Sequence, residues 1–279
     1  MATIGSLDEN VYIASEDNEP GPLRRFYDSY YRLILGGSAV VAFLVWWEWA
    51  GTSGAVNPLF ISSPSRIVHA YAGLIASGEL GKDVWISSLE FLYGFALAIV
   101  VGIPFGILMG WYRPLEAIFD PFVNFFYSTP RVALLPLMII WLGIGMNSKI
   151  AIVFLGAVFA ILINTIVGVQ NLDASLLRAA RSFGATDLQI FRTIALPGTV
   201  PFLITGVRLG LGHALIGVVV GELYAATAGV GYLIAVAGNT FQTDKVFVGV
   251  TIVAAAGMFF TEVFKRIERH FQTWKPKIN

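Results

Sequence analysis

The sequence predicts an all-α membrane protein with about six transmembrane helices. Of its 279 residues, 56% are hydrophobic and 13% are charged, whereas charged residues make up about 25% of a typical soluble domain. The mean hydropathy is +0.73. Several apolar runs approach the length of about 20 residues that a helix needs to cross the hydrocarbon core. Segments rich in charge, glycine or proline separate these runs, as expected for helices joined by turns.

Charge and composition exclude several classes of function. Lys plus Arg number 18, as do Asp plus Glu, so net charge indicates no nucleic-acid partner. The lack of Cys excludes disulfides, thiolate metal sites and a Cys nucleophile. No Gly-rich loop is followed by Lys-Ser or Lys-Thr, so the chain should not hydrolyse ATP itself. No constellation of nucleophiles, carboxylates or histidines predicts a catalytic or metal site, and we expect a chain that is no enzyme and binds no cofactor.

The two ends of the chain differ from its middle. Residues 1–31 are acidic and carry a Pro-Gly-Pro break, which predicts a disordered cytoplasmic extension. A transmembrane domain is expected over 32–265. Its first span, near Leu33–Ala50, ends in a Trp-rich segment typical of the headgroup region. Residues 266–279 are basic and are expected to form a cytoplasmic tail.

An amphipathic helix and a second span are expected next. Pro64–Ser77 has Pro in its first turn and Ser-Gly at its end, and both are typical helix boundaries. A second span is expected over Val84–Trp111. Arg113-Pro114 should stop it, because the residue before a proline disfavours the helical conformation.

The third apolar segment, Leu115–Leu142, is interrupted by Pro121, Pro130 and Pro136. A proline inside a helix removes a hydrogen bond and clashes with the preceding turn. Broken helices at membrane depth occur where they are buried in protein or line a water-filled cavity. With Arg131 beside it, the broken segment is expected either to line a translocation pathway or to be a kink without a role in transport.

A fourth span is expected over Ile150–Gln170, and a polar, helix-forming insert follows it over 172–197. Asp173 can cap a first short helix of this insert. Gly184 can close that helix in the left-handed conformation, which glycine adopts at low cost.

A second short helix is expected to open the other half of the insert. Thr186 and Gln189 have the spacing of a capping box. Pro197 disfavours helix at Leu196 and predicts a boundary there. The insert therefore reads as two stiff helices joined at a bend, which suits a docking platform for a partner protein.

The fifth span, expected over Thr199–Gly221, is rich in small residues. Gly206 and Gly210 form a small-xxx-small pair that allows close helix contact, made either within this chain or with a second copy of it. A short apolar segment at Val230–Ala237 precedes a sixth span near Val246–Phe264.

The basic residues predict that both termini are cytoplasmic, because Lys and Arg favour that side. With this orientation, the cytoplasmic cations are Arg24, Arg25, Arg32, Arg113, Arg178, Arg181, Arg192, Lys265, Arg266, Arg269, Lys275 and Lys277. Those left outside are Arg66, Lys82, Lys149 and Lys245. The polar insert then faces the cytoplasm.

Polar residues and prolines within the spans are candidates for the translocation pathway. They are Pro130, Arg131, Pro136, Arg208, His213 and Glu222. A buried cation is costly, so Arg131 and Arg208 should each contact an anionic solute or make a structural pair, for instance Arg131 with Glu90. His213 fits a hydrogen-bonded core residue better than a metal ligand. Glu222 either helps to close the outer side or reaches solvent, and the solvated reading is slightly favoured.

The insert resembles the cytoplasmic coupling loop of ABC importer permeases. The match is Ala179-Ala180, three residues, Gly184, nine residues and then Ile194-x-Leu196-Pro197. Weaker segments follow in the family's order, among them Ser87-Ser88-Leu89, Leu135-Pro136-Leu137 and Gly229-Val230-Gly231-Tyr232. The resemblance covers about Pro64 to Trp274 and is greatest to the nitrate/sulfonate/taurine group.

This resemblance implies a type I ABC importer permease fold (MetI-like) in the cell inner membrane. The implied solute is a small organic or inorganic anion such as an aliphatic sulfonate, taurine or nitrate. A thiamine precursor, riboflavin or another organic solute is an alternative, and an ion-coupled secondary transporter is a more remote one. The implied partners are a second copy of the chain, two cytoplasmic ATPase subunits holding ATP and Mg, an extracytoplasmic solute-binding protein, and membrane lipid.

The resemblance also implies which residues dock the ATPase. They are Arg178, Ala179, Ala180, Arg181, Ser182, Gly184, Ala185, Asp187, Leu196 and Pro197. Arg178 stands where the family usually has Glu, and Glu90 stands where relatives often have Arg. The charge contacts at these two positions therefore do not transfer from the family.

Overall fold

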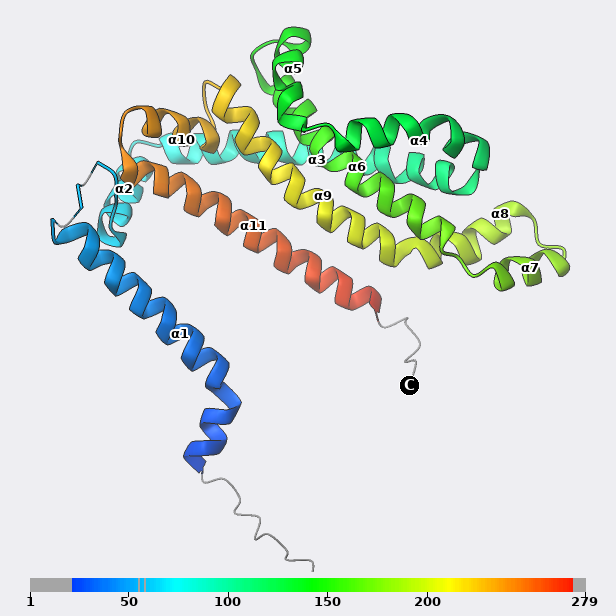
Figure 1. The fold of residues 1–279 in the computed structure, drawn as a ribbon, viewed down its shortest axis with the longest axis horizontal. Helices are drawn as coiled ribbons and strands as arrows, with labels where there is room; N and C mark the ends of the chain where they lie inside the picture. The colour runs from blue at the N-terminus through cyan, green and yellow to red at the C-terminus, as the bar shows by residue number, and fades with distance from the viewer. Residues whose placement is uncertain (1–21, 55, 58, 273–279) are drawn as a thin grey trace, which may run out of the picture.

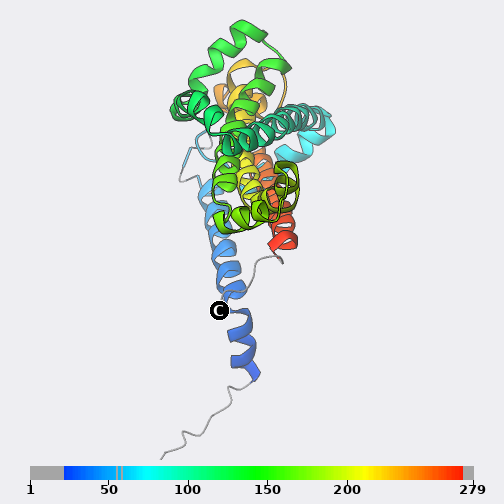
Figure 2. The same ribbon diagram turned by 90° about the vertical axis from the view of Figure 1, so that its right-hand side faces the viewer.

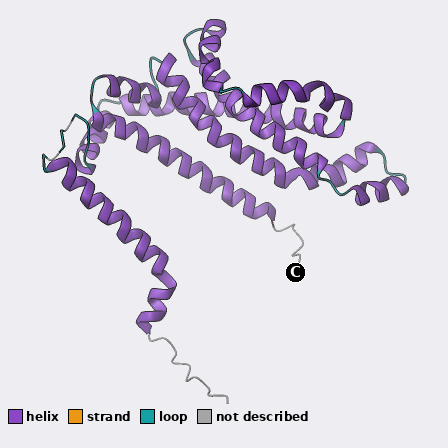
Figure 3. Cartoon of the chain, viewed as in Figure 1, coloured by secondary structure: helices purple, strands orange, loops and turns teal. Residues whose placement is uncertain are grey.

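The computed structural model describes residues 22–54, 56–57 and 59–272, and all regular secondary structure in them is helical (Figure 3). The α-helices are α1 (Pro22–Thr52), α2 (Pro64–Ala76), α3 (Glu79–Trp111), α4 (Arg113–Ser128), α5 (Leu135–Leu142), α6 (Met146–Gln170), α7 (Ala174–Ser182), α8 (Asp187–Ile190), α9 (Leu196–Ala225), α10 (Val230–Asn239) and α11 (Thr243–Gln272). A 3₁₀ segment, η1 (Arg131–Leu134), precedes α5, and a π segment, η2 (Phe191–Ala195), precedes α9.

The expected number of spans is confirmed. Within the described residues, 5 helices are long and apolar enough to cross a membrane, and the bent pair α4–α5 would make up to 6. The short helix α2 begins at Pro64 as predicted. The hydroxyl of Ser63 caps it by accepting a hydrogen bond from the N–H of Arg66.

The third segment is broken once, whereas three interruptions were expected. The two arms, Arg113–Ser128 and Arg131–Leu142, meet at 95°, and Pro130 stands at this break. Pro121 lies inside α4, and Pro136 lies in the first turn of α5. A first-turn proline is tolerated because its missing N–H would have no helical partner there.

The core is a layer in which α6 lies between α3 and α9 (Figure 1). Glycines allow this close approach. A Cβ added at Gly94 of α3 would lie 2.6 Å from the Cβ of Val153 in α6. One added at Gly206 would lie 2.8 Å from the Cβ of Asn164. The small-residue pair of the fifth span is thus used within this chain.

The first and last spans are the least covered. Only 11% of the apolar window of α1 and of α11 is buried, against 50% for α6. Figures 1 and 2 show α1 leaning away from the other spans. In a membrane, these two helices present apolar surface to lipid or to another chain.

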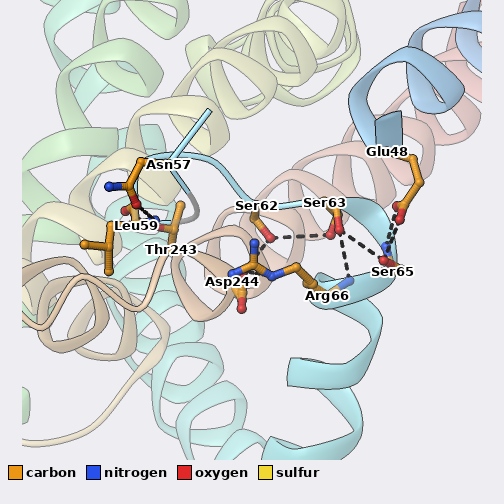
Figure 4. A network of polar contacts seen from close by, with 9 residues as sticks. All are labelled: Glu48, Asn57, Leu59, Ser62, Ser63, Ser65, Arg66, Thr243 and Asp244. Carbon is orange, nitrogen blue, oxygen red and sulfur yellow. Dashed lines mark hydrogen bonds and ion pairs between the residues drawn. The ribbon is translucent and has the colours of Figure 1, made fainter. Parts of the chain in front are cut away.

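A polar network joins the C-terminal end of α1 to the N-terminal ends of α2 and α11 (Figure 4). Glu48 at the end of α1 accepts from the N–H and the hydroxyl of Ser65, at 2.9 Å and 2.6 Å. Asp244 of α11 accepts from Ser62 at 2.6 Å and lies 3.6 Å from the guanidinium of Arg66. These bonds hold α1 to the domain at its C-terminal end.

Both terminal spans extend beyond their expected limits. The helix α1 begins at Pro22, so 22–31 is helical where a disordered extension was expected. The helix α11 continues to Gln272, past the expected start of the tail at 266. The rest of the predicted extension and tail, 1–21 and 273–279, lies outside the described residues.

Candidate functional site

The polar insert forms the predicted pair of capped helices. The Asp173 carboxylate accepts from the N–H of Ser175 at 2.7 Å and from its hydroxyl at 2.6 Å. These bonds lower the pKa of Asp173 below its usual value, chiefly through the Ser175 hydroxyl. Gly184 is left-handed, with φ of 76°. Thr186 and Gln189 make a reciprocal capping box, so the predicted caps and the left-handed glycine are confirmed.

The insert lies at one end of the molecule (Figure 1), and several of its apolar side chains are exposed there. Phe183, at the bend, is 92% exposed, and Leu176 and Leu188 are also exposed. A weak ion pair, 4.0 Å between Arg181 and Asp187, bridges the bend. An exposed apolar tip ringed by charge is typical of a surface that binds another protein.

Pro197 does not end a helix, which corrects the boundary expected there. Asp187–Ala225 is one continuous helical rod of 39 residues. The π segment η2 makes this possible: the N–H of Leu196 bonds to the carbonyl of Phe191, and Pro197 falls in the first turn of α9. A π turn pairs an N–H with the carbonyl five residues earlier instead of four, so the hydrogen bonds continue up to the residue before the proline. The second helix of the insert therefore runs directly into the fifth span.

This continuous helix also contacts the C-terminal end of α3. The rings of Phe191 and Trp111 meet edge to face, with 6.0 Å between their centroids. A displacement of the insert would therefore act on both α9 and α3.

Arg131 and His213 are brought together inside the helical layer. Nη1 of Arg131 lies 3.4 Å from Nδ1 of His213, and its guanidinium lies 5.5 Å from the centre of the Tyr127 ring. A cavity of about 120 Å³ adjoins the pair. Of the other pathway candidates, Pro130 precedes Arg131 at the helix break.

The remaining membrane cations are paired with carboxylates. Lys149 binds Glu90 at 2.7 Å, and both side chains are almost fully buried. This corrects the expectations that Lys149 is an outer surface cation and that Arg131 can pair with Glu90. Arg208 pairs with Glu268 of α11 at 2.9 Å, which supports its structural reading.

Glu222 is 1% exposed, so the favoured reading as a solvated carboxylate is wrong. It accepts from the hydroxyl of Ser87 in α3 at 2.5 Å and from the N–H of Gly231 at 2.6 Å. Burial of a carboxylate is tolerated here because these donors satisfy it.

Two further bonds hold the start of α10 against α3. The N–H of Gly229 donates to Asp83 at 2.9 Å, and that of Val230 donates to Ser87 at 2.8 Å. Acidic and hydroxyl acceptors suit a helix N-terminus, where backbone N–H groups are free. Together with Glu222, they tie the N-terminal ends of α3 and α10 to the C-terminal end of α9.

Comparison with known proteins decides the family. Residues 102–273 match the model of the binding-protein-dependent transport system inner membrane component. The chain belongs to this family. It is thus a permease subunit of an ABC importer, a transport protein that is not itself catalytic.

Relatives and solved structures agree with the family. The taurine transport system permease TauC of Escherichia coli (strain K12) is 31% identical over 247 residues, 87% of this permease and 90% of TauC. SsuC of Bacillus subtilis (strain 168), named as an aliphatic sulfonates transport permease, is 36% identical over 229 residues, 82% of this chain and 83% of SsuC. A chain of the inward-facing MetNI methionine ABC transporter has the same fold, with a TM-score of 0.57 at 22% identity, covering 68% of this chain and 94% of that one.

Several polar residues of the permease escaped sequence reasoning. Tyr127 and Asp83 gave no signal, and Ser87 stood out only as part of a family-like segment, because each takes its role from a partner far along the chain. Lys149 was expected to be an outside cation, although its place directly before a strongly apolar span could have indicated burial. In the part of the chain that the structure describes, no group of three His, Cys, Asp or Glu side chains could hold a metal ion.

Proposed function

We propose that the permease forms the membrane part of an ATP-driven importer for a small sulfonate or related organic anion. The names of its relatives TauC and SsuC support this class of solute. A second copy of the chain, two cytoplasmic ATPase subunits and an extracytoplasmic solute-binding protein complete the transporter. ATP and Mg are held by the ATPase subunits. Both termini of the permease face the cytoplasm, as its basic residues favour.

The observation that carries this proposal is the exposed helix pair of the insert and its continuity with α9. The tip formed by Phe183 and its neighbours sits in a cleft of an ATPase subunit. When the ATPase subunits close on ATP, the insert moves with them. The continuous helix Asp187–Ala225 transmits this movement. Its length grows by about 1.5 Å for each residue, so it reaches far from the insert.

The rod carries the movement to the translocation pathway. His213 lies in its middle, and Glu222 lies near its outer end. Tilting α9 alters the contact between His213 and Arg131 and strains the bonds of Glu222 to Ser87 and Gly231. The outer end of the pathway then opens to receive solute from the binding protein.

Gly184 provides the test of the coupling role. A side chain added there meets no neighbouring atom, so a substitution acts through the backbone alone. A β-branched residue is strained at positive φ by about 1–2 kcal/mol, whereas Asn tolerates this conformation. We expect Gly184→Val to abolish solute-stimulated ATP hydrolysis by the reconstituted transporter while the permease stays in the membrane. Gly184→Asn, the matched control, should retain it.

Normal solute-stimulated ATP hydrolysis by the Gly184→Val transporter would refute the lever. Loss in both variants would show that this position contributes contacts rather than backbone shape.

A further inference from the structure

We propose that Arg131 and His213 form a binding site, midway across the membrane, for the anionic head group of the translocated solute. This inference rests on the proposed function, because it requires the solute to be an anion. It adds to that function the place inside the permease where the solute's charge is recognised.

The depth of the pair fits a translocation site. His213 lies near the middle of α9, and its carbonyl lies 3.0 Å from the position of a Cβ added at Gly156, in the middle of α6. Arg131 opens η1 directly after the 95° break between α4 and α5. Transporters place solute sites near the bilayer midplane, where broken helices expose backbone and side chains to the pathway.

Arg131 differs from the other cations inside the helical layer. Lys149 has Glu90 and Arg208 has Glu268 as counter-charges. Among the described residues, no carboxylate lies within ion-pair distance of Arg131. Its Nε is buried and has no hydrogen-bond acceptor. A cation at this depth is costly without an anion, so an incoming anion supplies the missing counter-charge.

The proton arrangement of His213 makes the pair a set of donors. Arginine can only donate hydrogen bonds, so the contact with Arg131 requires Nδ1 of His213 to accept. The proton of the neutral imidazole then resides on Nε2, which can donate to a ligand. Arginine adds a planar fork of N–H groups that matches the paired oxygens of a sulfonate or carboxylate.

The cavity beside the pair selects for size and polarity. Its volume is about 120 Å³, which is space for a small anion. Apolar side chains form most of its wall, with small residues between them: Val132, Ile152, Gly156, Ile216, Gly217 and Val220. Such a wall suits a short aliphatic tail attached to an anionic head group.

Transport of ethanesulfonate by proteoliposomes containing the complete transporter tests the site. We expect Arg131→Gln to lower the uptake rate at least tenfold. ATP hydrolysis stimulated by the loaded binding protein should stay within about twofold of wild type, because the coupling insert is intact. Arg131→Lys keeps the charge without the fork and should lower uptake less. His213→Leu should weaken uptake, since it removes both the Nε2 donor and the Nδ1 acceptor that contacts Arg131.

Arg266→Gln is the control. It removes an arginine charge from α11, where Arg266 pairs with Glu262 on the surface, and it should transport as wild type. Should Arg131→Gln fail to fold, the Lys variant alone decides: uptake equal to wild type would overturn the site. Equal uptake by Arg131→Gln and wild type would overturn it too.

The same assay separates failure of this site from failure of the proposed function. If wild type imports ethanesulfonate and the Arg131 variants import it equally well, only the site is wrong. If the wild-type transporter takes up no ethanesulfonate and imports a neutral solute instead, the proposed solute class fails, and the site fails with it.

Discussion

Single residues decide how this permease keeps charge inside a membrane. The buried carboxylate of Glu90 has its counter-charge in Lys149 of the neighbouring helix, at 2.7 Å. The two charges therefore form a neutral pair instead of an isolated carboxylate. Among the residues that the structure describes, Arg131 has no carboxylate partner of this kind, and this difference underlies the anion site proposed there.

The Glu90–Lys149 pair makes a prediction at this scale. Lys149→Met leaves a buried carboxylate without its partner, and breaking such a pair costs about 3–5 kcal/mol. The double variant Glu90→Leu/Lys149→Met removes both charges and should recover much of that loss. Denaturant unfolding of the purified permease in detergent measures all three proteins. A double variant no more stable than Lys149→Met would show that the pair does not set the cost.

At the scale of elements, α9 combines three tasks in one helix. Its N-terminal extension forms half of the polar insert, its middle carries His213, and its C-terminal end holds Glu222. The π segment η2 is the one departure from regular α geometry along the rod. The face that packs on α6 is lined by glycine, so the rod can approach α6 closely without bulky side chains between them.

Two glycines of α9 test this packing. Gly206→Ala places a Cβ within 2.8 Å of Asn164, and overpacking of this kind costs about 1–3 kcal/mol. At Gly212 an added Cβ meets nothing within 4 Å, and Ala favours helix over Gly by about 1 kcal/mol. We expect thermal unfolding of the detergent-solubilised permease to occur at a lower temperature in the first variant and to be unchanged or higher in the second. The opposite order would contradict close packing at Gly206.

At the scale of the whole molecule, the permease is a layer of helices in which the first and last spans are only partly covered by protein. The spans α3, α6 and α9 bury one another, while α1 and α11 leave most of their apolar surface open (Figures 1 and 2). The polar network around Glu48 fastens α1 at its C-terminal end (Figure 4). Such surfaces agree with a subunit whose exposed apolar faces are covered by lipid and by a second copy of the chain.

The prediction for the whole molecule concerns its orientation in the membrane. Because the sequence contains no Cys, an introduced Cys is the single thiol that a maleimide can label. Phe60→Cys lies between α1 and α2, and Phe183→Cys lies at the tip of the insert; both positions are well exposed. With both termini inside, a membrane-impermeant maleimide should label Phe60→Cys in intact spheroplasts. Phe183→Cys should be labelled only after the membrane is opened. The reverse pattern would place the insert outside and exclude docking to a cytoplasmic ATPase.

The sequence by itself determined the features that depend on near neighbours. The spans, the caps at Asp173 and Thr186, the left-handed Gly184 and the presence of a proline break in the third apolar segment all follow from residues within a few positions of one another, since capping and backbone conformation are local. The order of these signals along the chain was also enough to indicate the family.

Only the tertiary structure decided which distant groups meet. Lys149 with Glu90, Arg131 with His213, and Glu222 with Ser87 join helices separated by long stretches of chain. Continuity past Pro197 likewise became visible only in the structure, where η2 carries the helix to Leu196 and its Phe191 ring packs against Trp111 of α3. The physical reason is that an unpaired charge within a membrane is costly, so the role of such a charge depends on its partner. The packing of the helices, and not their order in the chain, determines which groups become partners.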